Sequence, residues 1–134
     1  MLVNVSYNKP DLDRLIDSEV GPAFSLLDRI KRGGIGSPKL WIESASEGTR
    51  ELLERDINNN TCNIELRPSG LILRFRSLLE TYAFVLPFSD SDIRMDRDGS
   101  YRLSRASNHI LIHSRRENAR RYFNRLFREQ DAIQ

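Results

Sequence analysis

Apolar and polar residues alternate in short runs between residues 62 and 114, and residues that favour turns separate the runs. Successive side chains of a strand point to opposite faces of a sheet, so this period of two indicates strands with one buried face. The apolar positions are Ile64 and Leu66; Leu71, Leu73 and Phe75; Tyr82, Phe84, Leu86 and Phe88; Ile93 and Met95; Tyr101 and Leu103; and Ile110 and Ile112. Runs this short and closely spaced predict an antiparallel meander.

The turns between these runs have signals of their own. Pro68-Ser69-Gly70 predicts a tight reversal in which the glycine supplies a positive φ, and Asp98-Gly99 predicts a hairpin. A further turn is expected around Ser107-Asn108. Pro87 has no N–H to donate to a neighbouring strand, so its strand is expected to be an edge, to bulge or to end there.

A different period governs the chain from about residue 115 to residue 129. Apolar residues recur there at spacings of three and four, which places them in one stripe along a helix. The stripe consists of Ala119, Tyr122, Phe123, Leu126 and Phe127. Arginines occupy most of the other positions, so we expect this helix to cover the apolar face of the meander with its stripe.

The first 60 residues contain shorter apolar groups. The expected elements are a short edge strand at 2–5, a helix that begins at 10 and is broken by Gly21-Pro22, a second helix at 23–32, a flexible glycine-rich connector at 33–38, a brief strand or helix anchor at 40–42, and a third helix at 46–56 with Ile57 on its apolar face. The first two helices are expected to pack on each other or on the meander, and residues 58–60 end the third as a polar linker. We interpret the chain as a single domain, 1–134, with a helical extension at 1–60 and the sheet and its helix at 61–134.

Composition is that of a globular protein, with 39% hydrophobic and 30% charged residues. No apolar run is as long as a membrane span, which needs about 18 residues. The first residues do not have the pattern of a secretory signal, so we expect a cytoplasmic protein. Cys62 is the only cysteine, which excludes an internal disulfide and any metal site with several cysteine ligands. At the start of a strand it is expected to be a small buried residue.

The run CNIELRPSGLILRFRSLLETYAFVLPFSDSDI, which starts at Cys62, resembles the opening of bacterial pleckstrin-homology-like domains. The matching pieces are Ser69-Gly70, Leu71 to Phe75, Leu86 to Asp90, and Ile93. The resemblance covers residues 62–129 and extends to small uncharacterised bacterial proteins. It implies an α+β fold in which an antiparallel bent sheet or half-barrel is capped by the C-terminal helix. The basic cluster that eukaryotic members use for phosphoinositides has no residue-by-residue match, so the resemblance implies no lipid site.

The sequence contains no complete motif for catalysis or metal binding. His109 and His113 stand four apart in an expected strand, roughly 13 Å from each other, and are interpreted as surface residues. The aspartates at 90, 92, 96 and 98 are interpreted as turn residues balanced by nearby arginines, although a looser divalent-ion site stays open. The glycines at 33–38 lack the Gly-Lys-Ser/Thr ending of a phosphate loop. With no nucleophile elbow or dinucleotide fingerprint either, we predict no enzyme, cofactor or metal site.

Charge is distributed unevenly, with a net of −2 over residues 1–60 and +4 over residues 61–134, and arginine supplies 18 of the 21 basic residues. The candidate anion-binding residues are Arg67, Arg74 and Arg76 on the first hairpin and Arg116, Arg120 and Arg121 on the last helix. A salt-bridged surface explains the same arginines. Our first hypothesis is therefore a binding module for a protein or peptide partner, which includes a second copy of the chain. The alternative is a module that binds a polyanion, either nucleic acid or a phospholipid headgroup, and a small enzyme with an unrecognised site is the least favoured.

Overall fold

The computed structural model describes residues 1–55 and 60–133, and its fold is α+β. The described strands are β1 (Leu2–Asn4), β2 (Leu40–Ala45), β3 (Thr61–Arg67), β4 (Gly70–Ser77), β5 (Glu80–Pro87), β6 (Asp92–Met95), β7 (Tyr101–Arg105) and β8 (Asn108–Ile112). They form one eight-stranded sheet in the order β1-β5-β4-β3-β2-β8-β7-β6, and every pairing is antiparallel. Strands β3, β4 and β5 form one meander and β6, β7 and β8 another, so the single meander expected over residues 62–114 is confirmed only as these two parts, which β2 joins. Strand β5 ends at Pro87, which is one of the outcomes expected there.

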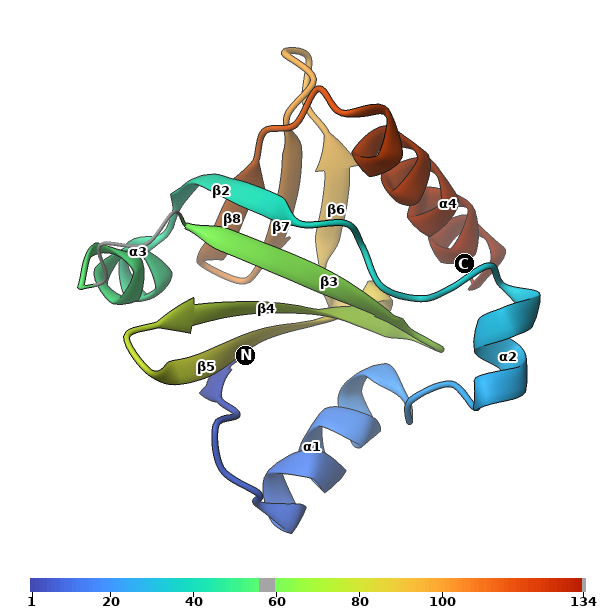
Figure 1. Ribbon diagram of the computed structural model, residues 1–134, viewed down its shortest axis with the longest axis horizontal. Coiled ribbons are helices and arrows are strands. Elements are labelled where there is room, and N and C mark those ends of the chain that lie inside the picture. Colours follow the sequence, from blue (N-terminus) through green and yellow to red (C-terminus); the bar gives the residue numbers. More distant parts are fainter. Residues whose placement is uncertain (56–59, 134) are drawn as a thin grey trace.

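Strand β2 holds the two halves of the sheet together. Leu40 and Trp41 pair with β3, whereas Ile42, Ser44 and Ala45 pair with β8. The register shifts between Ile42 and Ser44, and an irregularity of this kind bends a strand. Figure 1 shows the result, in which β3, β4 and β5 run across the direction of β6, β7 and β8.

Helix α4 (Glu117–Ile133) covers the concave side of this bent sheet. It buries the stripe that the sequence predicts, with Phe123 fully enclosed and stacked on Tyr101 of β7 at 3.8 Å between ring centroids. The hydroxyl of Tyr122 donates to the backbone oxygens of Ile35 at 3.0 Å and Ile64 at 3.3 Å. The helix therefore contributes apolar cover and also a hydroxyl group that reaches the connector before β2 and strand β3.

A second, smaller core lies on the convex side. Helix α1 (Pro10–Val20) places Ile16 and Val20 against Ile72, Ala83 and Val85, which point outward from β4 and β5. Strand β4 is consequently buried on both faces where α1 crosses it, which explains its unbroken apolar start at residues 71–73. The expectation that α1 packs on the meander is confirmed.

The boundary at residue 60 does not follow this architecture. Strand β1 is one edge of the sheet, as expected, and β2 lies in its middle, between β3 and β8. The described part of residues 1–60 therefore contributes strands as well as the helices α1, α2 (Leu26–Lys31) and α3 (Glu47–Glu54). The expected end of the third helix, its residue Ile57 and the first part of the linker at 58–60 lie outside the described residues.

Two glycine segments differ from expectation. The connector at 33–38 is fastened to β3, because Ser37 N donates to Ile64 O at 2.8 Å and Leu66 N donates to Ile35 O at 2.9 Å. Gly70 does not have a positive φ. A Cβ at Gly70 would collide with Leu86 O and lie 2.6 Å from Val20 Cγ1, so glycine is required there by close approach of β5 and α1.

None of the helices within residues 1–55 and 60–133 combines the length and the apolar character that crossing a membrane requires.

Candidate functional site

The strand registers place a set of polar residues on the convex face beyond the reach of α1. Trp41 lies opposite Thr61, and Arg76 lies opposite Thr81. In the neighbouring row, Asn63 lies opposite Arg74. Lys39 precedes Leu40 of β2 by one residue and so shares the outward face with Trp41.

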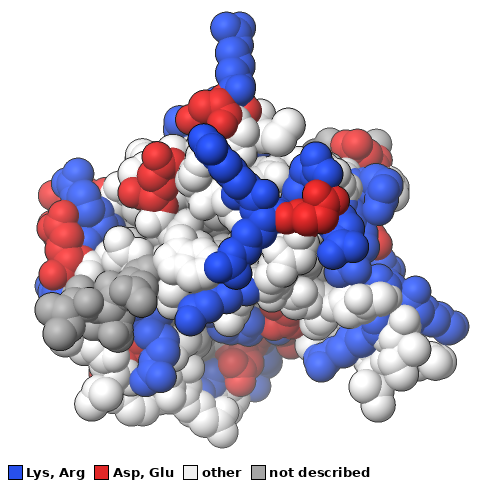
Figure 2. Space-filling model, turned by 45° about the horizontal axis from the view of Figure 1, so that its top comes forward, with Lys and Arg blue, Asp and Glu red and all other residues white. Residues whose placement is uncertain are grey.

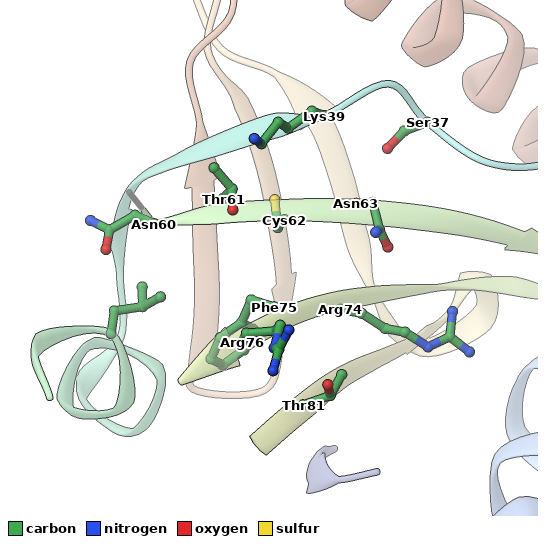
Figure 3. Close-up of a pocket in the computed structure, with 11 residues that line it drawn as sticks. Ser37, Lys39, Asn60, Thr61, Cys62, Asn63, Arg74, Phe75, Arg76 and Thr81 are labelled. Atoms are coloured by element: carbon green, nitrogen blue, oxygen red, sulfur yellow. The ribbon is translucent and has the colours of Figure 1, made fainter. Parts of the chain in front are cut away.

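Differences in side-chain length turn this face into a groove, which we call the β2–β4 groove. Its floor is β3, where Thr61 and Asn63 are short. One wall is formed by Lys39, immediately before β2, and the other by Arg74 and Arg76 of β4. Figure 3 shows this arrangement, with Lys39 on one side of the β3 residues and both arginines on the other. The hollow has a volume of about 560 Å³.

The groove is basic. None of the described residues that line it is an aspartate or glutamate, whereas three are cationic. Arg74 donates to Glu65 Oε1 at 2.7 Å, and among the described residues no carboxylate lies within 4.0 Å of Lys39 or Arg76. The remaining polar lining comes from hydroxyl and amide groups of Ser37, Asn60, Thr61, Asn63 and Thr81. Such a surface can bind an anionic group and donate hydrogen bonds to it.

Arg67, which the alternating pattern places on the wet face, is in fact buried, with 9% of its surface exposed. The period of two predicts one buried face, but the opposite face is buried here as well, because α1 and the loop after it cover this end of β3. Arg67 donates to Glu65 at 2.6 Å, to Asp17 at 3.0 Å and to the backbone oxygen of Gly21 at 2.9 Å. It therefore ties α1 to the sheet and is not free for a ligand.

Glu65 lies two residues beyond Asn63 on β3 and pairs with both Arg67 and Arg74. Burial by itself would raise the pKa of its carboxyl group, but hydrogen bonds and charge from Arg74 and Arg67 outweigh burial and lower the pKa. The carboxylate is thus held ionised between two guanidinium groups. It separates the buried Arg67 from the accessible cations of the groove.

The helix arginines lie in different places. The Arg116 guanidinium Cζ lies over the ring of Trp41, 4.8 Å from its centroid, on the outward face of β2. Arg120 forms an ion pair with Glu117 at 2.7 Å on the exposed side of α4. Arg121 lines a second hollow of about 460 Å³ between α4 and the connector, together with Arg125 and Arg128. The six candidate arginines therefore do not converge on one site.

Other titratable groups offer little chemistry. Burial raises the pKa of the Cys62 thiol to about 12, so the thiol is protonated at neutral pH and is not a nucleophile. The small buried residue that the sequence predicts is confirmed. Arg94 pairs with Asp92 and Asp96 at 3.4 and 3.5 Å, in keeping with aspartates balanced by arginines. The residues that the structure describes contain no group of three or more His, Cys, Asp or Glu side chains arranged to hold a metal ion.

A separate apolar patch lies on α2. Leu26, Leu27 and Ile30 fall on one side of this six-residue helix and are 73%, 61% and 69% exposed. The sequence predicts that the second helix packs on the first helix or on the meander, but these three side chains do not take part in such packing. Contiguous exposed apolar residues of this kind mark surfaces that contact other proteins.

Neither a protein-family model, nor a curated protein, nor a solved structure matches this chain. The function of the protein is therefore inferred from the geometry of the β2–β4 groove and of the α2 patch.

Sequence reasoning identified Arg74 and Arg76 but missed the β2 side of the groove. Lys39 and Trp41 alternate with the buried residues Leu40 and Ile42, and this short alternation was a signal for a strand with an outward basic and aromatic face. Thr61 was not singled out, because a short polar residue forms the floor of a groove only when longer side chains stand on the strands at both sides of it.

Proposed function

We propose that the protein is a binding module of pleckstrin-homology-like architecture that holds an anionic ligand in the β2–β4 groove. The single observation that carries this proposal is a concave surface with three cations and, among its described lining residues, no carboxylate. The bent antiparallel sheet and the helix after it support the architectural part of the proposal.

The chemistry of the groove favours binding over catalysis. Its cations are guanidinium and ammonium groups, which bind phosphate or carboxylate as donors of charge-assisted hydrogen bonds. Its one thiol, that of Cys62, is protonated at neutral pH. We therefore propose that the ligand leaves the groove chemically unchanged.

The test is binding of inorganic polyphosphate to the wild-type protein and to two double variants of equal net charge. Lys39→Glu/Arg76→Glu reverses both cations that have no described carboxylate partner within the groove. Lys31→Glu/Arg97→Glu reverses two exposed cations on α2 and the β6–β7 turn. Each charge-assisted hydrogen bond is worth about 1.5–3 kcal/mol, so the groove variant should lose about tenfold or more in affinity at each residue.

The control variant should retain affinity within about threefold, because its charges lie elsewhere and are screened beyond about 10 Å at moderate salt. Affinity of the wild type should also fall as salt rises. Equal losses in the two double variants would mean that overall charge, and not the groove, holds the polyanion.

A second function, binding to a protein partner, is favoured by the apolar patch on α2. A pull-down from source lysate should then yield a partner that Leu27→Ser/Ile30→Ser no longer captures. Leu79→Ser is the matched control, because Leu79 is 87% exposed at the turn between β4 and β5. A partner that both variants capture equally would not use the patch. Light scattering across protein concentrations tests whether the partner is a second copy of the chain.

A further inference from the structure

The indole ring of Trp41 lies at the edge of the β2–β4 groove, where β2 meets the start of α4. Its neighbours in the strand, Leu40 and Ile42, are 0% and 4% exposed on the opposite face, whereas Trp41 itself is half-buried. Arg116 Cζ lies 4.8 Å from the ring centroid and Lys39 Nζ lies 6.0 Å from it. Two cations therefore lie over the face of a partly exposed aromatic ring, with Arg116 the nearer of the two.

The surface around this ring is rich in positive charge. Figure 2 shows the molecule from the side of β2 and the start of α4, and basic side chains cross the middle of this face with some acidic ones between them. Across β3 from Trp41, Arg76 lies in the row of Thr61, because the register pairs Cys62 with Phe75 and continues by one residue. With strands about 4.8 Å apart, Arg76 and Trp41 start from backbone positions about 10 Å apart.

Cations and an aromatic ring thus lie together on this surface. A single-stranded nucleic acid has the complementary groups, because each unpaired base lies between two phosphates. Proteins that bind single strands combine a positively charged groove with aromatic side chains on which bases stack. Sheets that bind RNA likewise present aromatic side chains on an open face.

We propose that an unpaired base stacks on Trp41 in place of the cations that lie over the ring, and that Lys39, Arg116 and the groove arginines then hold the neighbouring phosphates. The ligand class is single-stranded nucleic acid. This inference rests on the proposed anion-binding function and adds the nature of the anion. A phosphoserine peptide or a lipid headgroup would engage the cations but gives the indole ring no planar partner, and a duplex keeps its base faces inside its own stack.

The chain provides its own probe, because Trp41 is the only tryptophan. Stacking of a base on the indole should quench its fluorescence. An oligothymidylate of about ten nucleotides, within the range of known single-strand sites, is the first ligand. Inorganic polyphosphate, which has the charge without the bases, and the duplex form of the same oligonucleotide are the comparisons at the same salt concentration.

Variants separate stacking from charge. Trp41→Ala should weaken binding of a fluorescein-labelled oligothymidylate, measured by anisotropy, about tenfold, while its affinity for polyphosphate stays within about twofold. Trp41→Phe keeps an aromatic ring and should restore most of the affinity. Circular dichroism spectra of both variants that match the wild type show that the sheet is intact.

The outcomes distinguish the two proposals. If wild-type protein binds polyphosphate or the duplex as tightly as the oligothymidylate, or if Trp41→Ala leaves oligothymidylate binding unchanged, nucleic-acid stacking is wrong while the anion groove stands. If Trp41→Ala loses both ligands equally with an unchanged spectrum, the ring does not read bases and the inference is also overturned. If the wild type binds neither polyphosphate nor oligothymidylate, both proposals fail.

Discussion

Replacement of Arg67 by alanine distinguishes a structural arginine from a ligand-binding one. Arg67 and Arg76 both belong to the first hairpin and both point away from the concave core in the sequence pattern. Arg67, however, is 9% exposed and donates three hydrogen bonds, whereas Arg76 is exposed on the wall of the groove. We expect Arg67→Ala to destabilise the fold and Arg76→Ala to leave its stability nearly unchanged.

The magnitude depends on the partners that Arg67 leaves behind. A hydrogen bond to a charged group contributes about 1.5–3 kcal/mol. Glu65 retains Arg74 as a partner at 2.7 Å, and the Asp17 side chain is 49% exposed, so both losses are partial. The Gly21 carbonyl loses the guanidinium as a donor. The expected loss in the free energy of unfolding is therefore about 2–4 kcal/mol.

Urea unfolding followed by circular dichroism measures this difference. For a slope of about 2 kcal/mol per molar urea, the midpoint of Arg67→Ala should fall by about 1–2 M, and that of Arg76→Ala by less than about 0.3 M. Arg67→Lys should lie between Arg67→Ala and the wild type, because an ammonium group cannot reproduce the fork of a guanidinium. Equal midpoints for Arg67→Ala and Arg76→Ala would refute the role of Arg67 as the tie between α1 and the sheet.

Three further predictions test the fold. Gly70→Ala should lower stability by about 3 kcal/mol or more, because the added Cβ has no space. Gly36→Ala, where the added Cβ would have nothing within 4 Å, should change stability by less than about 1 kcal/mol. Thermal unfolding compares the two variants, and similar melting temperatures would contradict the close approach at Gly70. Cys62 should resist a thiol reagent at pH 8 in the folded protein and react in urea, because burial raises its pKa to about 12; rapid labelling of folded protein would show that the thiol is accessible. The lowered pKa of Glu65 means that it stabilises the fold above its ordinary value of 4.5 and that this contribution is lost as the pH falls through the lowered value. Glu65→Gln should accordingly be less stable than wild type at pH 7, and the difference should narrow toward pH 3; a constant difference across this range would argue against the ion pairs.

The sequence determined much of the local structure. A period of two sets which side of a strand is apolar, and a period near 3.6 sets the stripe of a helix, so the strands from residue 62 onward and α4 could be predicted from residue order alone. The stop at Pro87 and the hairpin at Asp98-Gly99 arise from backbone chemistry that acts within a few residues. These predictions needed no knowledge of distant contacts.

Tertiary structure decided what each outward-facing residue does. Period-two alternation cannot tell a wet face from one that a helix covers, and α1 crosses the sheet over Ile72, Val85 and the end of β3 that carries Arg67. The groove exists because β3 places short side chains between longer ones on β2 and β4, and β2 is separated from β3 by a helix in sequence. The partners of β2 are chosen by long-range strand pairing, which a local pattern in the sequence does not reveal.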